Sequence, residues 1–321
     1  MRSLLNFIPF YSLIKFSYLI FKGEIAIRKA HKLLVVFLFI ILIEPFRYFE
    51  HLYFYIKQKK ISVRTPIFII GHWRSGTTFL QHALLSHSNL KGLSIYNAVF
   101  PLTFITTNWL KKPLNKFSSL LSLENKFQRK PLVWEDYEED DLALLMMLSK
   151  HSYYWKKIFG INYDFNSFDY KQWRYDYMYL LKKLSHQDPS KTLLLKSPPN
   201  TMRIKHILSV FPNAKFIYIK RDKDDVYQSM QFLWEVNQKH YSFMSMSQKE
   251  VSKEIEETYQ LFEEGYNHHK KMIPQANLQE VSFEKLIKTT QVEIQEMWNN
   301  LGLKVDERER ENLIKFLNAT N

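Results

Sequence analysis

The fold of this chain is decided by residues 65–80, whose sequence is TPIFIIGHWRSGTTFL. Residues 67–70 are apolar and mostly β-branched, and Pro66 and Gly71 bound them, so they predict a buried parallel strand. The residues after Gly76 have the apolar spacing of a helix. A strand, a glycine-containing turn and a helix start together predict a phosphate site, because backbone N–H groups and the positive end of the helix dipole converge there.

The position after Gly76 distinguishes this loop from the P-loop of nucleoside triphosphatases. Those loops follow G-x-x-x-x-G-K-[ST], with a lysine that contacts the β- and γ-phosphates. Here the spacing from Gly71 to Gly76 is kept, but Thr77 occupies the lysine position and the cation is Arg74, inside the loop. The loop is therefore expected to hold a phosphate without serving ordinary nucleoside triphosphate chemistry. A purely structural turn would seldom collect Arg, Ser, Gly and two Thr in succession.

Composition restricts the class of protein. The 321 residues suffice for one substantial α/β domain, alone or with an appendage, and an apolar content of 46% indicates a packed protein. The chain has no cysteine, which excludes disulfides, cysteine-ligated metals and thiol catalysis. No His/Asp spacing suggests a metal site. The net charge of +13 does not form a compact basic stripe, so nucleic acid is not expected as a partner.

Residues 1–60 hold ten Lys or Arg against three Glu, which is +7 of the total charge of +13. Basic residues lie there among aromatic and aliphatic clusters, which suits a helical segment on a membrane surface. The longest apolar run, 33–43, is shorter than the ~20 residues needed to cross a bilayer. A helical arm that covers substrate or forms a homo-oligomer, and a spanning helix, are the alternatives.

We therefore expect a basic, apolar helical segment at 1–60 and an α/β domain at 61–321. The expected location is peripheral, on the cytoplasmic side of the membrane, or else the cytoplasm.

Downstream, apolar patterning predicts strands at 193–196, 214–221 and 278–283, and helices at 201–210, 222–234, 247–271, 284–300 and 306–318. The strand–helix–strand order around 201–210 predicts a parallel sheet with a right-handed crossover. Sites in such sheets lie at the carboxyl ends of the strands. The loop at 71–78, Lys196 and Arg221 should therefore converge on one edge of the sheet.

An acidic group precedes the apolar run 142–148 and consists of Glu138, Glu139, Asp140 and Asp141. Acids at a helix start complement the helix dipole, so the group is either a helix start or part of a functional site. In so basic a chain, both interpretations stay open.

Three stretches together resemble the sulfotransferases that use 3′-phosphoadenosine 5′-phosphosulfate (PAPS). Residues 69–78, IIGHWRSGTT, are similar to the family's 5′-phosphosulfate loop. Residues 211–222, FPNAKFIYIKRD, continued to Ser229, are similar to its 3′-phosphate motif. Residues 195–198, LKSP, resemble the segment whose lysine faces the sulfuryl group in Golgi-type and bacterial members. The acidic group before an apolar helix is most similar to bacterial membrane-associated members.

The resemblance implies a three-layer, P-loop-like α/β fold with a central parallel sheet flanked by helices, with PAPS as co-substrate. It implies that the nucleotide is bound by Arg74, Ser75, Gly76, Thr77, Thr78, Arg221 and Ser229. Arginine suits the 3′-phosphate because its guanidinium binds bidentately. By analogy with phosphoryl transfer, Arg74 and Lys196 should stabilise the charge that grows on the bridging oxygen during in-line attack.

The general base does not follow from the resemblance. Many relatives have Glu or His in the neighbourhoods where this chain has Asn97 and Asn200, and an amide accepts no proton at neutral pH. We expect a member of the acidic group instead, with Glu139 ahead of Glu138, because a partly desolvated carboxylate among other acids has a raised pKa.

The acceptor is expected to carry a hydroxyl group or an amine, on an amphiphilic or glycan alcohol. Two alternative functions stay open. A P-loop nucleotide kinase or other phosphotransferase would need the missing loop lysine, and Thr77 speaks against it. An inactive membrane-surface scaffold with the same fold would not be expected to retain Arg74, Lys196 and Arg221 together.

Overall fold

The structure is a computed structural model and describes residues 11–23, 26, 29, 31–165 and 168–320. The chain divides into two compact units. Unit 1 comprises residues 1–62, 94–187 and 233–249, and unit 2 comprises 63–93, 188–232 and 250–321. Parts of the predicted segment 1–60, namely 1–10, 24–25, 27–28 and 30, lie outside the described residues. The expected division into 1–60 and 61–321 stays a prediction.

Unit 2 is built around a five-stranded parallel sheet in the order β2-β5-β1-β6-β7. Its strands are β1 (Ile67–Gly71), β2 (Leu90–Lys91), β5 (Thr192–Lys196), β6 (Lys215–Lys220) and β7 (Leu278–Ser282). Every residue of β1 is buried, as its apolar run predicts for a central strand. The sheet confirms the predicted α/β class. Strand β2 was not predicted, because two residues carry no recognisable pattern.

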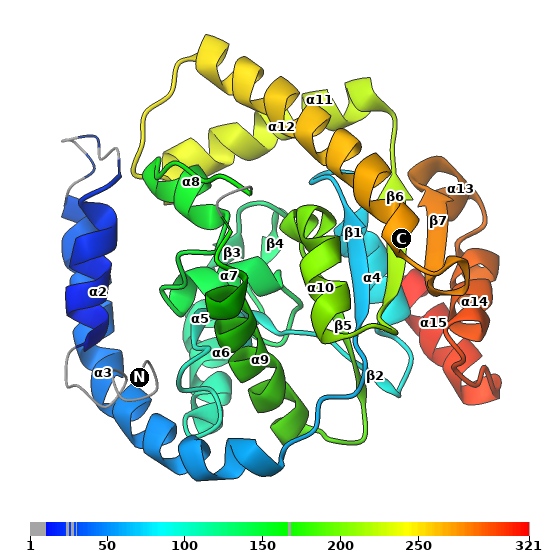
Figure 1. Cartoon of the computed structure of the whole chain (residues 1–321), viewed down its shortest axis with the longest axis horizontal. Coiled ribbons are helices and arrows are strands. Elements are labelled where there is room, and N and C mark those ends of the chain that lie inside the picture. Colours follow the sequence, from blue (N-terminus) through cyan, green and yellow to red (C-terminus); the bar gives the residue numbers. More distant parts are fainter. Residues whose placement is uncertain (1–10, 24–25, 27–28, 30, 166–167, 321) are drawn as a thin grey trace. The chain divides into compact units, whose positions relative to one another are not determined.

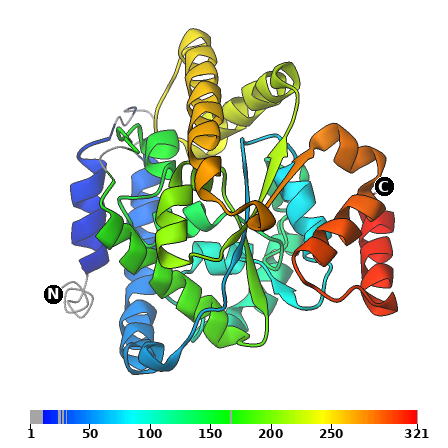
Figure 2. The same ribbon diagram turned by 45° about the vertical axis from the view of Figure 1, so that its right-hand side comes forward.

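Helices cover both faces of this sheet (Figure 1). The helices of unit 2 are α4 (Thr77–Leu84), α10 (Ile204–Val210), α11 (Lys223–Val236), α12 (Gln248–His269), α13 (Phe283–Lys288), α14 (Thr290–Asn300) and α15 (Glu307–Thr320), with residues 233–236 and 248–249 belonging to unit 1. On one face, Tyr218 of β6 stacks on Tyr266 of α12 with ring centroids 3.5 Å apart. On the other, α4 contacts α14 and α15 (Figure 2).

Two of the predicted helices differ in their bounds. The helix predicted at 284–300 is two helices, because Thr289 leaves the helical conformation, with φ −132° and ψ 40°. The helix predicted at 201–210 begins only at Ile204, after a 3₁₀ segment at Pro198–Arg203. Two consecutive prolines occupy the first positions of that segment.

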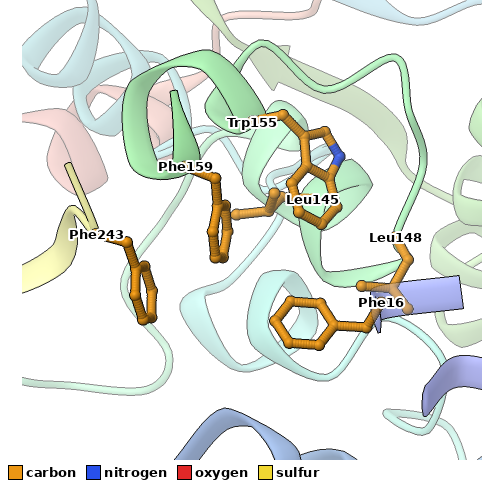
Figure 3. Packing of buried hydrophobic residues seen from close by; sticks show 6 residues of the cluster. All are labelled: Phe16, Leu145, Leu148, Trp155, Phe159 and Phe243. Atoms are coloured by element: carbon orange, nitrogen blue, oxygen red, sulfur yellow. The ribbon is translucent and has the colours of Figure 1, made fainter. Parts of the chain in front are cut away.

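Unit 1 is mainly helical. Its helices are α2 (Tyr11–Ile20), α3 (His31–Lys57), α5 (Ile95–Val99), α6 (Lys111–Leu120), α7 (Asp140–Met146), α8 (Tyr154–Phe159) and α9 (Tyr170–Gln187), with a small antiparallel pair, β3 (Glu124–Asn125) and β4 (Lys130–Pro131). Figure 3 shows one buried cluster, in which Phe16 of α2 lies near Trp155 and Phe159 of α8. Part of the predicted amino-terminal helical segment thus contributes to a buried core.

Helices α2 and α3 contact each other and run along one side of unit 1 (Figure 1). Across the described parts of the chain, no helix combines the length and the apolar character that a membrane span requires.

Candidate active site

The loop after β1 requires glycine at two positions. Gly71 has φ 140°, and a Cβ there would lie 2.5 Å from the carbonyl oxygen of Ile219. Gly76 has φ 93°, and a Cβ there would lie 2.3 Å from Cδ2 of Phe283. Both distances are far below van der Waals contact, and both φ values are ones that other residues avoid. The two glycines therefore allow the loop to fold tightly over β6 and the end of β7.

Arg74 adopts a left-handed backbone conformation, with φ 67°. Such a conformation costs a non-glycine residue about 1–3 kcal/mol and persists only where the surroundings hold it. Its side chain is held: Nε of Arg74 donates a hydrogen bond to Oγ of Ser229, at 2.7 Å. Nη1 of Arg221 also donates to the carbonyl oxygen of Arg74, at 3.4 Å. The predicted 5′-loop and 3′-phosphate motif are thus directly joined within unit 2.

Arg221 follows the end of β6, and its guanidinium lies 4.6 Å above the ring centroid of Phe283. Its Nη2 pairs with Oδ2 of Asp225 at 3.1 Å. Because the Asp225 carboxylate is exposed, this ion pair contributes little to stability. A phosphate could therefore take the place of Asp225 at small cost, while the aromatic ring keeps the guanidinium in position.

Lys196 is the last residue of β5 and stands beside Ile69 of β1 in the sheet register. Its side chain is buried. Because β1 pairs with β5 on one side and with β6 on the other, the carboxyl ends of these three strands are neighbours. The sheet therefore brings the loop, Lys196 and the residues after β6 to one edge, where parallel sheets bind ligands.

Sequence reasoning missed Thr201 and Phe283 at this edge, whereas Ser197 lies in the stretch 195–198 that it identified. Oγ1 of Thr201 accepts a hydrogen bond from the backbone N–H of Gly71 at 2.9 Å and donates to the carbonyl oxygen of Gly71 at 3.1 Å. The side chain of Ser197 is fully buried, and within the described part of the chain its Oγ has no hydrogen-bond partner. Phe283 lies against both Gly76 and Arg221. Of the two missed residues, only Phe283 had a signal, since it is the last residue of the strand predicted at 278–283.

The acidic group lies in unit 1, and two of its members have structural partners. Oδ2 of Asp141 accepts hydrogen bonds from the backbone N–H of Tyr153 at 2.7 Å and from Oγ of Ser152 at 3.1 Å, at the start of α8. Oδ2 of Asp140 accepts from the Tyr177 hydroxyl at 2.5 Å. Both carboxylates are fully buried. Asp140 and Asp141 therefore have positions typical of carboxylates that stabilise the fold.

Glu138 and Glu139 are held differently. Oε2 of Glu139 accepts a hydrogen bond from the Tyr154 hydroxyl at 3.1 Å, and Oε1 of Glu138 accepts from the backbone N–H of Glu139 at 2.9 Å. Burial, followed by the charge of Glu139, raises the pKa of Tyr154 well above its ordinary value, so this phenol stays a donor at neutral pH. Glu139 is buried and Glu138 is half-buried.

The two asparagines at the familiar base positions are structural. Nδ2 of Asn97 donates to Oε1 of Gln187 at 3.0 Å, and the backbone N–H of Asn97 donates to Oγ of Ser94, which caps α5. Oδ1 of Asn200 accepts from Nη1 of Arg203 at 3.4 Å.

Comparison with known proteins agrees with the fold and the loop. The model of the sulfotransferase family matches residues 66–307. Two curated relatives, the omega-hydroxy-beta-dihydromenaquinone-9 sulfotransferases Stf3 of Mycobacterium bovis and Mycobacterium tuberculosis, are each 27% identical to this chain over 252 residues. The match covers 74% of this chain but only 63% of the length of those relatives.

Two solved structures share the fold. Sulfotransferase STF1 from Mycobacterium tuberculosis H37Rv has a TM-score of 0.68 at 19% identity, covering 81% of this chain and 73% of that one. Sulfotransferase STF9 from Mycobacterium avium has a TM-score of 0.67 at 17% identity, covering 84% of this chain and 72% of that one. Since the family match extends over most of the sequence and includes the loop, β5 and β6, the chain belongs to the sulfotransferase family.

Proposed function

We propose that this protein transfers the sulfuryl group of PAPS to a hydroxyl group of an amphiphilic acceptor. The acceptor oxygen attacks sulfur in line, a new S–O bond forms, and the bond from sulfur to the bridging oxygen of the 5′-phosphate breaks. The acceptor proton passes to a general base. The products are the sulfated acceptor and adenosine 3′,5′-bisphosphate.

The observation that carries this proposal is the hydrogen bond from Arg74 to Ser229, supported by the contact of Arg221 with the loop. PAPS has two separate anionic groups, and these three residues connect the two places where the anions would bind. We assign the 3′-phosphate to Arg221 and Ser229. Backbone N–H groups of residues 75–78, at the start of α4, would bind the 5′-phosphate.

Arg74 and Lys196 would stabilise the negative charge that develops on the bridging oxygen as the S–O bond breaks. Positioned cations in a water-poor site are the usual source of acceleration for such transfers. Lys196 is buried, which strengthens its interaction with a nearby anion because the surroundings screen it less. No metal enters this proposal.

For the general base we propose Glu139, with Glu138 as the second candidate. The support is by comparison within the acidic group: Asp140 and Asp141 are fully buried and hold the Tyr177 hydroxyl and the start of α8, whereas Glu139 accepts a hydrogen bond from the Tyr154 hydroxyl. A carboxylate that binds a tyrosine hydroxyl can exchange it for an acceptor hydroxyl without releasing the start of a helix.

The acceptor class is proposed from two considerations. The Stf3 relatives are named for a hydroxylated menaquinone, which is a lipophilic alcohol. Unit 1 of this chain also exposes aromatic side chains, including Trp109 and Phe117, which suit contact with an apolar substrate body. Sulfation assays with lipophilic alcohols, glycans and amines as acceptors distinguish these classes, and the lipophilic alcohols should be preferred.

Calorimetric titration of the full chain tests the donor. Adenosine 3′,5′-bisphosphate should bind in the micromolar range, and ATP should bind far more weakly. The variant Arg221→Lys should weaken the bisphosphate by about tenfold or more, because lysine cannot bind a phosphate bidentately. The matched control is Arg308→Lys, an exposed arginine on α15, which should bind like the wild type. No binding of the bisphosphate would overturn the proposal, and a preference for ATP would favour a phosphotransferase.

A further inference from the structure

Helix α3 has three charged residues on its buried side and a row of large apolar residues on its exposed side. Glu44, Arg47 and Glu50 are buried, although charged side chains usually face water. Exposed large apolar side chains follow the other side of the helix: Leu34, Val35, Leu38, Ile41, Leu42, Phe46, Tyr48, Phe49, Leu52, Tyr53 and Ile56. We call these residues the outward stripe. Leu42 and Ile56 are each 71% exposed, and Phe49 is 64% exposed.

Contacts on the buried side prevent the helix from turning its stripe inward. Glu50 forms an ion pair with Lys183 of α9, and both side chains are completely buried. Oε2 of Glu50 also accepts from the backbone N–H and from the hydroxyl of Thr106, at 2.7 and 2.8 Å. Rolling α3 about its axis would break these bonds and leave the charge of Lys183 buried without its partner, which is costly.

The outward stripe is continuous along the helix. Its members recur at intervals of three or four residues, which places them on one side of an α-helix. A helix of 27 residues is about 40 Å long. On the neighbouring α2, Ile14 and Tyr18 are each 64% exposed. Apolar surface of this extent usually marks an interaction site.

The charges around the stripe are of one sign. Among the described residues of 11–62, the acids are Glu44 and Glu50, and neither is exposed. By contrast, Lys57, Lys59 and Lys60 at the end of the helix are exposed.

Three lysines in this region lie over tyrosine rings: Lys22 over Tyr18 at 5.0 Å, Lys57 over Tyr53 at 4.2 Å and Lys59 over Tyr55 at 5.8 Å. Tyrosine and lysine together are typical of the boundary between lipid and water, where the ring meets the headgroup level and the amine reaches the phosphates.

We propose that the outward stripe binds the surface of an anionic phospholipid bilayer, with the axis of α3 parallel to the membrane plane and the lysines at the lipid phosphates. Charge complementarity favours this partner over a second copy of the chain. If two copies packed stripe to stripe, the basic carboxyl-terminal end of α3 in one copy would face the same end of α3 in the other copy, or else its amino-terminal end with His31 and Lys32. In either arrangement, positive charges would lie against positive charges. The cytoplasmic leaflet is anionic, so the proposal includes peripheral attachment on that side.

Co-sedimentation of the full chain with vesicles tests the proposal. Vesicles of equal parts phosphatidylcholine and phosphatidylglycerol should bind the protein, and vesicles of phosphatidylcholine alone should bind it more weakly. The double variant Leu42→Glu/Phe49→Glu should lose binding to both, because each glutamate adds repulsion and removes apolar contact. The matched control, Ile287→Glu/Val292→Glu, changes two exposed apolar residues of unit 2 and should bind like the wild type.

A second variant separates the electrostatic contribution. Lys57→Gln/Lys59→Gln/Lys60→Gln should weaken binding to the anionic vesicles by about fivefold for each lysine, and should leave binding to phosphatidylcholine unchanged. Retained binding of the Leu42→Glu/Phe49→Glu variant would overturn the proposal. So would a wild-type dimer in light scattering that this variant converts to a monomer, since the stripe would then be covered by a second copy. Unchanged circular dichroism checks that each variant is folded.

Discussion

Arg74 and Ser229 are 155 residues apart in the chain, yet Nε of Arg74 donates a 2.7 Å hydrogen bond to Oγ of Ser229. The bond connects a loop after β1 with helix α11 after β6, because β1 and β6 are adjacent in the parallel sheet. It also holds the side chain of a residue whose backbone is in the left-handed region. Substitution of Arg74 or Ser229 should therefore change how the other residue binds the nucleotide.

Arg74→Lys should lower kcat by about 10²–10³-fold, because one donor aimed at developing charge has roughly that effect. Ser229→Ala should weaken adenosine 3′,5′-bisphosphate by about tenfold or more, since hydrogen bonds to charged groups contribute about 1.5–3 kcal/mol. Titration of the two single variants and the double variant with adenosine 3′,5′-bisphosphate should give a coupling free energy between Arg74 and Ser229 of about 0.5–3 kcal/mol in nucleotide binding. Strictly additive effects would show that the two side chains act separately. Ser209→Ala, an exposed serine on α10, serves as the control.

Gly76→Ala should abolish nucleotide binding, because its methyl group would lie 2.3 Å from the ring of Phe283 and push the loop away from β7. Gly302→Ala is a matched control: Gly302 also has a positive φ, of 77°, but a methyl group there would meet nothing closer than Lys215 Nζ at 3.8 Å. It should therefore lower the melting temperature without changing nucleotide affinity. Normal affinity of Gly76→Ala would contradict the proposed loop geometry.

Glu139→Gln should affect catalysis, whereas Asp141→Ala should affect the stability of the fold. Glu139→Gln should lower kcat by about 10²–10⁴-fold, with a changed pH profile and little change in the free energy of unfolding, as expected for a general base. Asp141→Ala should instead lower the free energy of unfolding by about 1–2 kcal/mol, because the N–H groups at the start of α8 lose their acceptor. Steady-state kinetics and urea unfolding measure the two quantities. Near-normal turnover of both Glu139→Gln and Glu138→Gln would remove these residues as bases.

Glu309 should make stability depend on pH in the acid range. Burial by itself raises the pKa of this carboxyl, but hydrogen bonds from the side chain and the backbone N–H of Ser88 outweigh burial, so its pKa is lowered in the folded protein. The stability that Glu309 contributes is present above its unfolded pKa and is lost as pH falls through the folded pKa.

Glu309→Gln should therefore lower the free energy of unfolding by about 1–3 kcal/mol at pH 7, and its difference from the wild type should shrink as the medium becomes more acidic than the unfolded pKa of glutamate. Urea unfolding across the acid range measures this difference. Glu311→Gln, whose carboxylate is exposed, should have little effect at any pH. A difference that stays constant with pH would mean that the Glu309 charge is not what stabilises the contact.

Local patterns predicted the elements of unit 2 well. The alternation and length of apolar runs at 67–70 and 214–221 identified buried strands, and the rule that parallel sheets bind ligands at carboxyl ends placed Lys196 and Arg221 on the same edge. The break at Thr289 and the late start of α10 were missed, because helix bounds depend on a few residues whose signals are weak. Thr201 was missed because its partner, Gly71, lies 130 residues away in the sequence, so that no local spacing pattern indicates the contact.

By itself, the sequence determined that a glycine loop with Arg74 follows a buried strand, and that 1–60 combines apolar and basic residues. Those are local properties, set by side-chain period and by backbone conformations that only glycine adopts readily. Tertiary structure alone decided that Arg74 meets Ser229 and that the charged side of α3 faces inward. The physical reason is that a buried charge or a strained backbone is stable only beside a particular partner, here Lys183 for Glu50 and Ser229 for Arg74, more than 100 residues along the chain.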